Sequence, residues 1–488
     1  MNNRVSVSIL SFFFILFYGC SSSVDSYESS GSLAKIYPEY TGTYIPYNIA
    51  PLNFEIQEDA DKFIVRFVVE GKDSFEVNTK QNVMIPIKKW KKLLNNNKGE
   101  KLMLRVFSKK DEKWTKYNDL VFSIAQEPID SYLAYRLIEP GYSAWNRMGI
   151  YQRCLENYDE TPILKNTLTS KSCMNCHTFH KNNPETMVFH IRGEGGGTVL
   201  AKEGEATKIN TKMPWMMAAG VYPRWHPDGR YIAFSTNQTK QFFHTLDENK
   251  IEVLDLDSDL VIYDTENNKM FTDSIIQAKD SYETFPEWSP DGKYLYFCTA
   301  PALPMPNSFA DLKYSLVRVA YDVENETFSN QVDTLFSAYE TGKSVSLPRI
   351  SPDGKRLVFC LFDYGTFPIW HKENDLYELN LESGKIRALD EVNSNESDSF
   401  HSFSSNGRWM VFSSRRMDGT YTHPFITYLD DAGNWHKPFL LPQKHPDHYD
   451  FLIKSFNVPE FITGKVKVSP YTLQDAWEGK SINPMEKE

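Results

Sequence analysis

The sequence predicts an all-β protein built largely from repeated β-hairpins. Aromatic residues make up 14% of the 488 positions, and the chain contains 24 Gly and 26 Pro. Aromatic side chains favour strands, whereas Gly and Pro favour the turns between them. The turn dipeptide Asp-Gly also recurs in similar surroundings at residues 228–229, 291–292 and 353–354. These observations predict short strands joined by tight turns over most of the chain.

Length and charge exclude several classes of protein. A chain of 488 residues is too long for one ordinary domain, so we expect at least two units. The mean hydropathy of -0.47 excludes a polytopic membrane protein. The net charge is -11, and the one dense basic cluster is the short stretch at residues 88–92. A nucleic-acid partner is therefore not expected, because such binding needs a concentrated positive surface.

The first 19 residues are predicted to be a lipoprotein signal peptide. Arg4 precedes an apolar run over residues 6–18, which is too short to span a bilayer. Gly19 before Cys20 resembles the bacterial lipobox, and that resemblance implies a lipidated Cys20 and a membrane-anchored protein of the cell envelope. Asp does not follow Cys20, which by resemblance to enterobacterial lipoproteins favours the outer membrane. The alternative is ordinary secretion with an incidental Cys20. Residues 20–40 are expected to form a flexible tether.

Residues 41–127 are predicted to form a β-sandwich-like domain. Apolar and polar residues alternate over residues 62–71 and 101–109, as they do in half-buried antiparallel strands. Trp114 is the expected core aromatic residue of this domain.

Residues 128–187 are predicted to be an aromatic, haem-binding linker. They contain Cys173-Met-Asn-Cys176-His177, the C-x-x-C-H pattern of c-type haem attachment. Two thiols at this spacing can hold one porphyrin, and the adjacent His177 can bind its iron. The alternatives are a redox dithiol and half of a zinc site.

Several residues are candidates for the second axial ligand of the iron. His190 is the first choice and Met187 the second, because both lie a short loop away from His177. His226 and His401, in later repeats, are further candidates. Without such a ligand the iron would be five-coordinate, which would suit peroxide or small-gas chemistry. Arg192 is the expected partner of a haem propionate, since guanidinium pairs well with carboxylate.

Four segments of the second half share one pattern. Each contains a short strand, a tight Asp-Gly or Asn-Gly turn and a second strand with alternating apolar residues. The segments are residues 222–237 (YPRWHPDGRYIAFSTN), 285–300 (FPEWSPDGKYLYFCTA), 347–362 (LPRISPDGKRLVFCLF) and 400–415 (FHSFSSNGRWMVFSSR).

These repeats resemble those of the TolB-type β-propeller family. The resemblance covers roughly residues 188–470 and implies antiparallel sheets packed around a central channel. Residues 188–488 are accordingly expected to form a propeller of five blades, with six as the alternative. Cys298 and Cys360 occupy matching repeat positions, so both are predicted to be buried apolar residues, and Cys154 a buried free thiol.

The expected function is that of a cell-envelope lipoprotein with one covalent haem c. The haem would serve electron transfer or redox-linked docking, and the propeller would bind an unidentified redox or envelope partner. One alternative is a propeller that binds protein or glycan, in which the haem is a sensor or a structural staple. Another is a peroxidase-like haem enzyme. A non-enzymatic role is favoured, and no catalytic residue is assigned.

Overall fold

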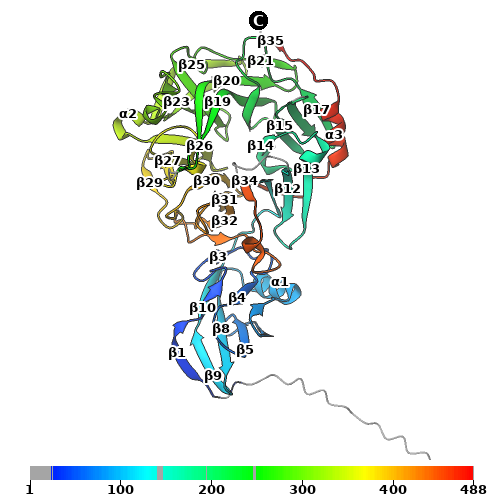
Figure 1. Ribbon diagram of the computed structural model, residues 1–488, viewed down its shortest axis with the longest axis vertical. Helices are drawn as coiled ribbons and strands as arrows, with labels where there is room; N and C mark the ends of the chain where they lie inside the picture. Colours follow the sequence, from blue (N-terminus) through cyan, green and yellow to red (C-terminus); the bar gives the residue numbers. More distant parts are fainter. Residues whose placement is uncertain (1–23, 25, 140–146, 194, 246–248, 487–488) are drawn as a thin grey trace, which may run out of the picture.

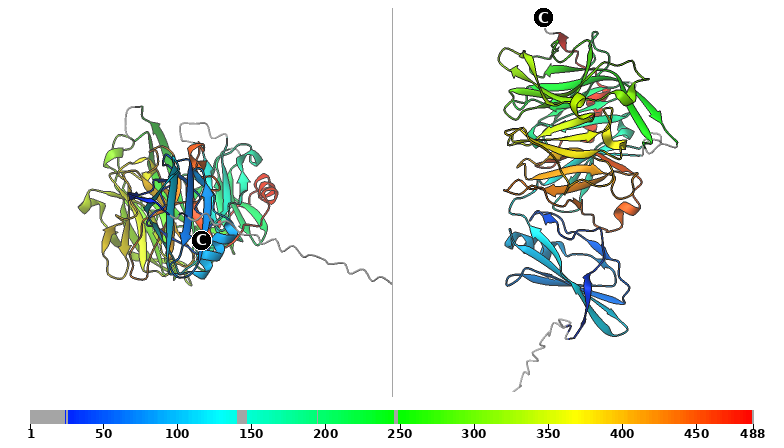
Figure 2. Two further views of the ribbon diagram at one scale, coloured as in Figure 1. Left: turned by 90° about the horizontal axis from the view of Figure 1, so that it is seen from below. Right: turned by 90° about the vertical axis from the view of Figure 1, so that its left-hand side faces the viewer.

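A computed structural model of the chain describes residues 24, 26–139, 147–193, 195–245 and 249–486. A small N-terminal domain adjoins a larger body of sheets that are arranged in a ring (Figure 1). Viewed from the side, the two parts lie end to end along the long axis (Figure 2). Cys20, the predicted lipidation site, and the predicted signal peptide of residues 1–19 lie outside the described residues. Within the described part, no helix has the length and apolarity needed to cross a bilayer.

The N-terminal domain combines two sheets and a helix. One sheet contains β1 (Glu28–Leu33), β9 (Lys113–Asn118), β8 (Lys101–Lys110), β10 (Leu120–Ile124), β3 (Tyr44–Ile45), β5 (Lys62–Val68) and β6 (Ser74–Thr79). The other contains β2 (Ile36–Tyr37), β4 (Phe54–Ile56) and β7 (Asn82–Val83). Helix α1 (Ile87–Asn96) follows β7.

The N-terminal domain differs from the prediction in three respects. Strand β1 pairs with β9, so the expected tether of residues 20–40 already belongs to the folded domain from Glu28 on. Helix α1 was not expected, although Trp90, Leu93 and Leu94 follow the helical period and are buried. The buried tryptophan of the core is Trp90, whose Nε1–H donates to the carbonyl of Ile49 at 3.0 Å, whereas Trp114 is only partly buried.

The ring contains six sheets in the part of the chain that the structure describes. The first consists of β34 (Ser455–Ile462), β11 (Tyr132–Ile138), β12 (Gly149–Cys154) and β13 (Glu160–Lys165). The second consists of β14 (Met174–Phe179), β15 (Thr186–Ile191), β16 (Gly197–Lys202) and β17 (Glu205–Ile209). The third consists of β18 (Gly220–Trp225), β19 (Tyr231–Phe243), β20 (Ile251–Asp264), β21 (Lys269–Phe271) and β35 (Met485–Glu486).

The other three sheets have four strands each. The fourth consists of β22 (Ser281–Trp288), β23 (Tyr294–Pro301), β24 (Ser315–Asp322) and β25 (Thr327–Phe336). The fifth consists of β26 (Ser344–Ile350), β27 (Arg356–Phe362), β28 (Asp375–Asn380) and β29 (Ile386–Ala388). The sixth consists of β30 (Asp398–Phe403), β31 (Trp409–Ser414), β32 (His423–Tyr428) and β33 (Phe439–Leu440). Helices α2 (Ala338–Thr341) and α3 (Pro470–Glu478) lie outside the sheets.

The innermost strands of these sheets close a β-propeller. Strands β34, β14, β18, β22, β26 and β30 contact one another in that cyclic order (Figure 1). The first blade joins the C-terminal strand β34 to β11, β12 and β13, which come from the middle of the chain. This pairing leaves no gap in the ring and covers two strand edges that would otherwise be open.

The described residues form six blades, which was the alternative to the expected five, and the propeller does not start at residue 188 as expected. The propeller begins at Tyr132, and the supposed linker of residues 128–187 supplies three strands of the first blade and the inner strand of the second. Strand β11 is buried at nearly every position. It therefore lacks the alternation by which half-buried strands are recognised in a sequence.

The predicted turns are confirmed. Gly229, Gly292, Gly354 and Gly407 all have φ between 69° and 79°. In each turn the Gly N–H donates to the carbonyl three residues earlier, at 2.8 to 2.9 Å. Cys154, Cys298 and Cys360 are buried free thiols, as predicted.

The N-terminal domain packs against the sixth blade. The ring of Tyr44 stacks on Tyr428 with 5.0 Å between centroids. The Nε1–H of Trp409 donates to the carbonyl of Pro128 at 3.0 Å, and Asn53 donates to the carbonyl of Lys444 at 2.9 Å. One apolar core, which includes Phe54 and Phe412, extends across this junction.

Closure of the ring by β34 can be tested with two Phe substitutions. Phe461 lies in β34 and is fully buried, whereas Phe451 is 78% exposed. Phe461→Ala should lower the free energy of unfolding by about 3–5 kcal/mol, because it leaves a cavity in the closing blade. Phe451→Ala should change it by less than about 0.5 kcal/mol. Denaturant titration measures both, and equal losses would contradict a closing role for β34.

Candidate functional site in the propeller channel

Each inner strand contains a bulge at the same position. The pairing register shifts there in all six inner strands of the described residues. The bulge places one non-glycine residue at a positive φ, a conformation that few side chains adopt. These residues are Cys176 (43°), Tyr222 (50°), Phe285 (52°), Leu347 (53°), Phe400 (49°) and Val458 (50°).

The bulge residue begins a run of four residues, which we call the tetrad. The second position is Pro in four tetrads and His in the other two. The third position faces one end of the channel, and the fourth is aromatic or aliphatic. The tetrads are residues 176–179 (CHTF), 222–225 (YPRW), 285–288 (FPEW), 347–350 (LPRI), 400–403 (FHSF) and 458–461 (VPEF).

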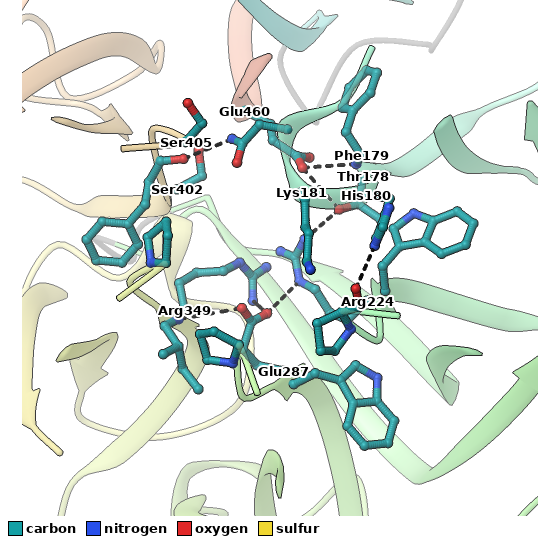
Figure 3. A pocket seen from close by; sticks show the side chains of 18 of the residues that line it. Thr178, Phe179, His180, Lys181, Arg224, Glu287, Arg349, Ser402, Ser405 and Glu460 are labelled. Atoms are coloured by element: carbon teal, nitrogen blue, oxygen red, sulfur yellow. Dashed lines mark hydrogen bonds and ion pairs between the residues drawn. The ribbon is translucent and has the colours of Figure 1, made fainter. Parts of the chain in front are cut away.

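The channel has three parts, which we name by their lining. The constriction is a cavity of about 30 Å³ between bulge residues, lined also by His177 and three arginines. The polar ring is the third tetrad residue of each blade and lines a pocket of about 360 Å³ at one end (Figure 3). The arginine mouth is a pocket of about 180 Å³, lined in part by Arg136, Arg192 and Arg415. The members of the polar ring are Thr178, Arg224, Glu287, Arg349, Ser402 and Glu460.

The polar ring links the closing strand to the second blade. Glu460 on β34 accepts the backbone N–H of Phe179 at 2.9 Å and the hydroxyl of Thr178 at 3.2 Å (Figure 3). Nη1 of Arg224 donates to the hydroxyl oxygen of Thr178 at 2.9 Å. Oε2 of Glu460 is buried without a hydrogen-bond partner. One carboxylate oxygen thus remains unmet at a buried position.

Glu287 joins the next two blades of the ring. Its Oε2 lies 3.0 Å from Nε of Arg224 and 3.6 Å from Nη1 of Arg349 (Figure 3). The three side chains are only 13–15% exposed. The two Arg and two Glu of the polar ring balance one another when all four are ionised.

Burial changes the acidity of the two ring carboxyls. It raises the pKa of Glu460 to about 7 and that of Glu287 to about 7, while the positive charge of Arg224 opposes both shifts. Near neutral pH the charge of the ring therefore depends on pH. When Glu287 and Glu460 are protonated, the positive charges of Arg224 and Arg349 are no longer balanced.

The arginine mouth contains a buried cation without an acidic partner. Arg136 is 8% exposed, and its Nη1 donates to Oδ1 of Asn175 at 2.8 Å and to the carbonyl of Met174 at 3.2 Å. Its Nε is buried without a hydrogen-bond partner. Glu139 lines the same pocket, but among the described residues no carboxylate lies within 4 Å of Arg136 or Arg192.

The predicted haem residues are divided between two parts of the channel. Cys173 and Arg192 line the arginine mouth, whereas Cys176 and His177 line the constriction. Burial raises the pKa of the Cys176 thiol and lowers the pKa of His177 to about 3. His177 is therefore a neutral imidazole, and its Nε2 is buried without a partner.

The predicted second ligands do not share a cavity with His177. Met187 packs in the core with Phe179 and Trp477. His190 lies on the opposite face of β15 from Met187, because successive residues of a strand alternate between its two faces. The Nδ1 of His190 is 3.1 Å from Oγ1 of Thr198. His226 and His401 also hold structural positions, with Nε2 at 3.0 Å from the carbonyl of Gly292 and at 2.8 Å from that of Val358.

This geometry does not fit a covalently attached haem. Attachment needs both thiols at the edge of one porphyrin, with His177 beneath the ring. The cavity shared by Cys176 and His177 measures only about 30 Å³, which is too small for a porphyrin ring. Cys176 and His177 are instead the first two residues of a tetrad, and His401 occupies the same position as His177 in the sixth blade. The repeat thus accounts for both residues.

The residues of the polar ring and Arg136 were not predicted from the sequence. A signal for the ring was present, since Arg224, Glu287, Arg349 and Ser402 are the third letters of the four recognised repeats. The segment at 458–461 (VPEF) follows the same pattern. It could have indicated a further inner strand and its Glu460.

Known proteins resemble parts of this chain. None of the protein-family models matches it. Dipeptidyl-peptidase 5 of Porphyromonas gingivalis is 25% identical over 199 residues, which cover 38% of this chain and 23% of that protein.

Several solved structures are similar over longer stretches. Puromycin hydrolase is 12% identical with a TM-score of 0.39, and the similarity covers 65% of this chain and 53% of that chain. Prolyl oligopeptidase B from Galerina marginata is 10% identical with a TM-score of 0.36, covering 83% and 53%. The tricorn protease is 12% identical with a TM-score of 0.34, covering 70% and 34%. The chain thus spans about half or less of the length of these three proteins.

The haem interpretation can be tested directly. The chain, produced together with c-type maturation machinery, should show no haem stain after denaturing electrophoresis. The reason is that the constriction cannot admit a porphyrin beside Cys176. A known c-type cytochrome run in parallel is the positive control, and covalent haem on this chain would overturn the assignment of residues 176–179 to a tetrad.

A second test uses the pH dependence of stability. The pKa of Glu460 is about 7 in the folded chain, against an ordinary value of 4.5, so the folded state binds the extra proton between these values. Stability from this group is present below pH 4.5 and is lost as the pH rises to about 7. Glu460→Gln should therefore gain stability relative to the parent, on the order of 3 kcal/mol, between pH 4.5 and pH 8.

Denaturant titration at several pH values measures this difference. Glu340→Gln, at an exposed position of α2, is the matched control and should follow the parent at all pH values. A difference that stays constant with pH would show that Glu460 does not titrate in this range.

Proposed function

We propose that this chain is a lipid-anchored binding protein of the bacterial cell envelope, whose propeller binds the carboxylate end of an extended ligand. The anchor is inferred from Gly19-Cys20, and the outer membrane remains the favoured location. The binding site is the arginine mouth of the channel. This proposal develops the expected role of the propeller as a binding platform, and it includes no redox step.

The observation that carries the proposal is the uncompensated charge of Arg136. A buried cation is costly unless an opposite charge accompanies it. Arg136 is 8% exposed and has no carboxylate partner among the described residues, and Arg192 adds a second guanidinium without one at the same mouth. An anion from a ligand would meet this need, and guanidinium matches carboxylate geometry well.

The size of the arginine mouth favours the end of a chain over a whole macromolecule. Its volume of about 180 Å³ leads to a constriction of about 30 Å³. A ligand can thus enter only by its terminal group. The lining also contains neutral hydrogen-bonding side chains, which suit the amide groups next to a C-terminal carboxylate; they include Thr239, Gln241, Thr422, Ser455 and Asn457.

Equilibrium dialysis of a randomised tetrapeptide library tests the proposal. The library with free C-terminal carboxylates should be retained about tenfold more strongly than the same library with C-terminal amides. Arg192→Gln, at an exposed position, should remove most of this preference, and Arg136→Gln should do the same if it folds. Arg105→Gln in the N-terminal domain is the matched control.

Equal retention of the two libraries would contradict the proposal. A carboxylate preference that survives in Arg192→Gln and in Arg136→Gln would also contradict it, since the anion would then bind elsewhere.

A further inference from the structure

A second cavity lies at the junction between the N-terminal domain and the sixth blade. Its volume is about 710 Å³, within the range typical of small-ligand pockets. Tyr37, Pro38 and Glu39 form its wall on the N-terminal side, and strand β32 with residues 449–450 and 452–453 forms part of the rest. None of its lining residues lines the channel.

His423, at the start of β32, is an unpaired polar group in the wall of this cavity. It is 2% exposed, and both of its ring nitrogens are buried without a hydrogen-bond partner. Its ring packs edge-on against Tyr449, with 5.1 Å between centroids. A neutral imidazole has one N–H donor and one acceptor nitrogen, and leaving them unmet in a buried site costs free energy.

The charge state of His423 depends on the groups that face it. Burial lowers its pKa to about 4, and His448 acts in the same direction, while Asp418 and Asp450 oppose the shift. The imidazole is therefore neutral at physiological pH. It offers a ligand both a donor and an acceptor.

The cavity also contains unbalanced negative charge. Glu391, Asp418 and Asp450 line it, and among the described residues no Lys or Arg nitrogen lies within 4 Å of their carboxylates. Asp450 accepts a hydrogen bond from the hydroxyl of Tyr37 at 2.6 Å, which leaves its charge in place.

The two cations of the lining are already paired. Arg416 lies 2.9 Å from Oδ1 of Asp398, and Lys437 lies 3.8 Å from Oε1 of Glu39. The surplus charge of the cavity is thus negative, and a ligand with a positive group would balance it.

Apolar side chains form the remaining surface of the cavity. Ile453 is 67% exposed at the cavity, and Phe451 beside it in the chain is 78% exposed. Together with the apolar residues of the lining, these two side chains form an apolar surface that a ligand could cover. The other apolar lining residues are Pro38, Met417, Phe425, Pro438, Leu440 and Leu452.

We propose that this cavity binds a short peptide segment in which a lysine or arginine adjoins a large apolar residue. The carboxylates of Glu391, Asp418 and Asp450 would receive the cation, and the apolar lining would receive its neighbour. The imidazole of His423 would pair with an amide N–H and a carbonyl of the peptide backbone. This site is separate from the arginine mouth and does not depend on the function proposed for it.

Calorimetric titration with two matched peptides tests the proposal. The first is N-acetyl-Phe-Arg-amide, and the second replaces Arg by citrulline, which keeps the shape of the side chain and removes its charge. The arginine peptide should bind about tenfold more tightly. Glu391→Gln, at an exposed position, should reduce this preference without changing the affinity for the citrulline peptide, and Glu340→Gln on α2 should have no effect.

His423→Phe tests the role of the imidazole. This variant keeps an aromatic ring of similar shape and removes the unmet polar atoms, so it should fold at least as well as the parent. It should weaken both peptides by a similar factor of about tenfold, while retention of the carboxylate library at the arginine mouth stays unchanged.

Two results would overturn the proposal. One is equal affinity for the arginine and citrulline peptides, and the other is the absence of binding by either peptide at about millimolar concentration.

Discussion

The bulge in every inner strand is the constraint on which the architecture of the channel depends. It holds a side chain such as Tyr222, Phe285 or Leu347 at positive φ, a conformation that is costly for bulky residues and persists only when surrounding packing requires it. Because the bulge recurs at the same height in each blade, its residues meet and narrow the channel. The residues after the bulge therefore also lie at matching heights in the six blades. As a result, the third tetrad residue of each blade faces the same end of the channel, where six polar side chains come together.

Charge inside the channel is arranged asymmetrically about this constriction. On one side, Arg224 and Arg349 lie beside Glu287, and Glu460 is held by groups from the neighbouring blade. On the other side, Arg136 has no acidic partner in the described chain. Since an unpaired buried charge is costly, the two ends of the channel differ in what they can bind, although the backbone repeats around the ring.

The two proposed sites have opposite charge and occupy different parts of the molecule. The arginine mouth lies on the propeller axis, whereas the cavity beside His423 lies where the N-terminal domain packs on the sixth blade. The continuous apolar core across that junction holds Tyr37 and Asp450 in place on either side of the cavity. The N-terminal domain thus contributes residues to the second of the two proposed sites.

The richness in strands, the hairpin turns at Gly229, Gly292, Gly354 and Gly407, and the burial of Cys298 and Cys360 could all be predicted from the amino-acid sequence. These features are local, because a turn dipeptide and alternating apolar residues encode them directly. The closure of the first blade by β34 and the place of Cys176 and His177 in an inner strand depend instead on tertiary contacts. Pairing between Tyr132 and Ile462 joins residues far apart in the chain, and β11 is buried on both faces. No local sequence pattern predicts such a long-range contact. The C-x-x-C-H motif, which suggests a haem site when it is considered alone, therefore proves to lie at an inner strand of a blade.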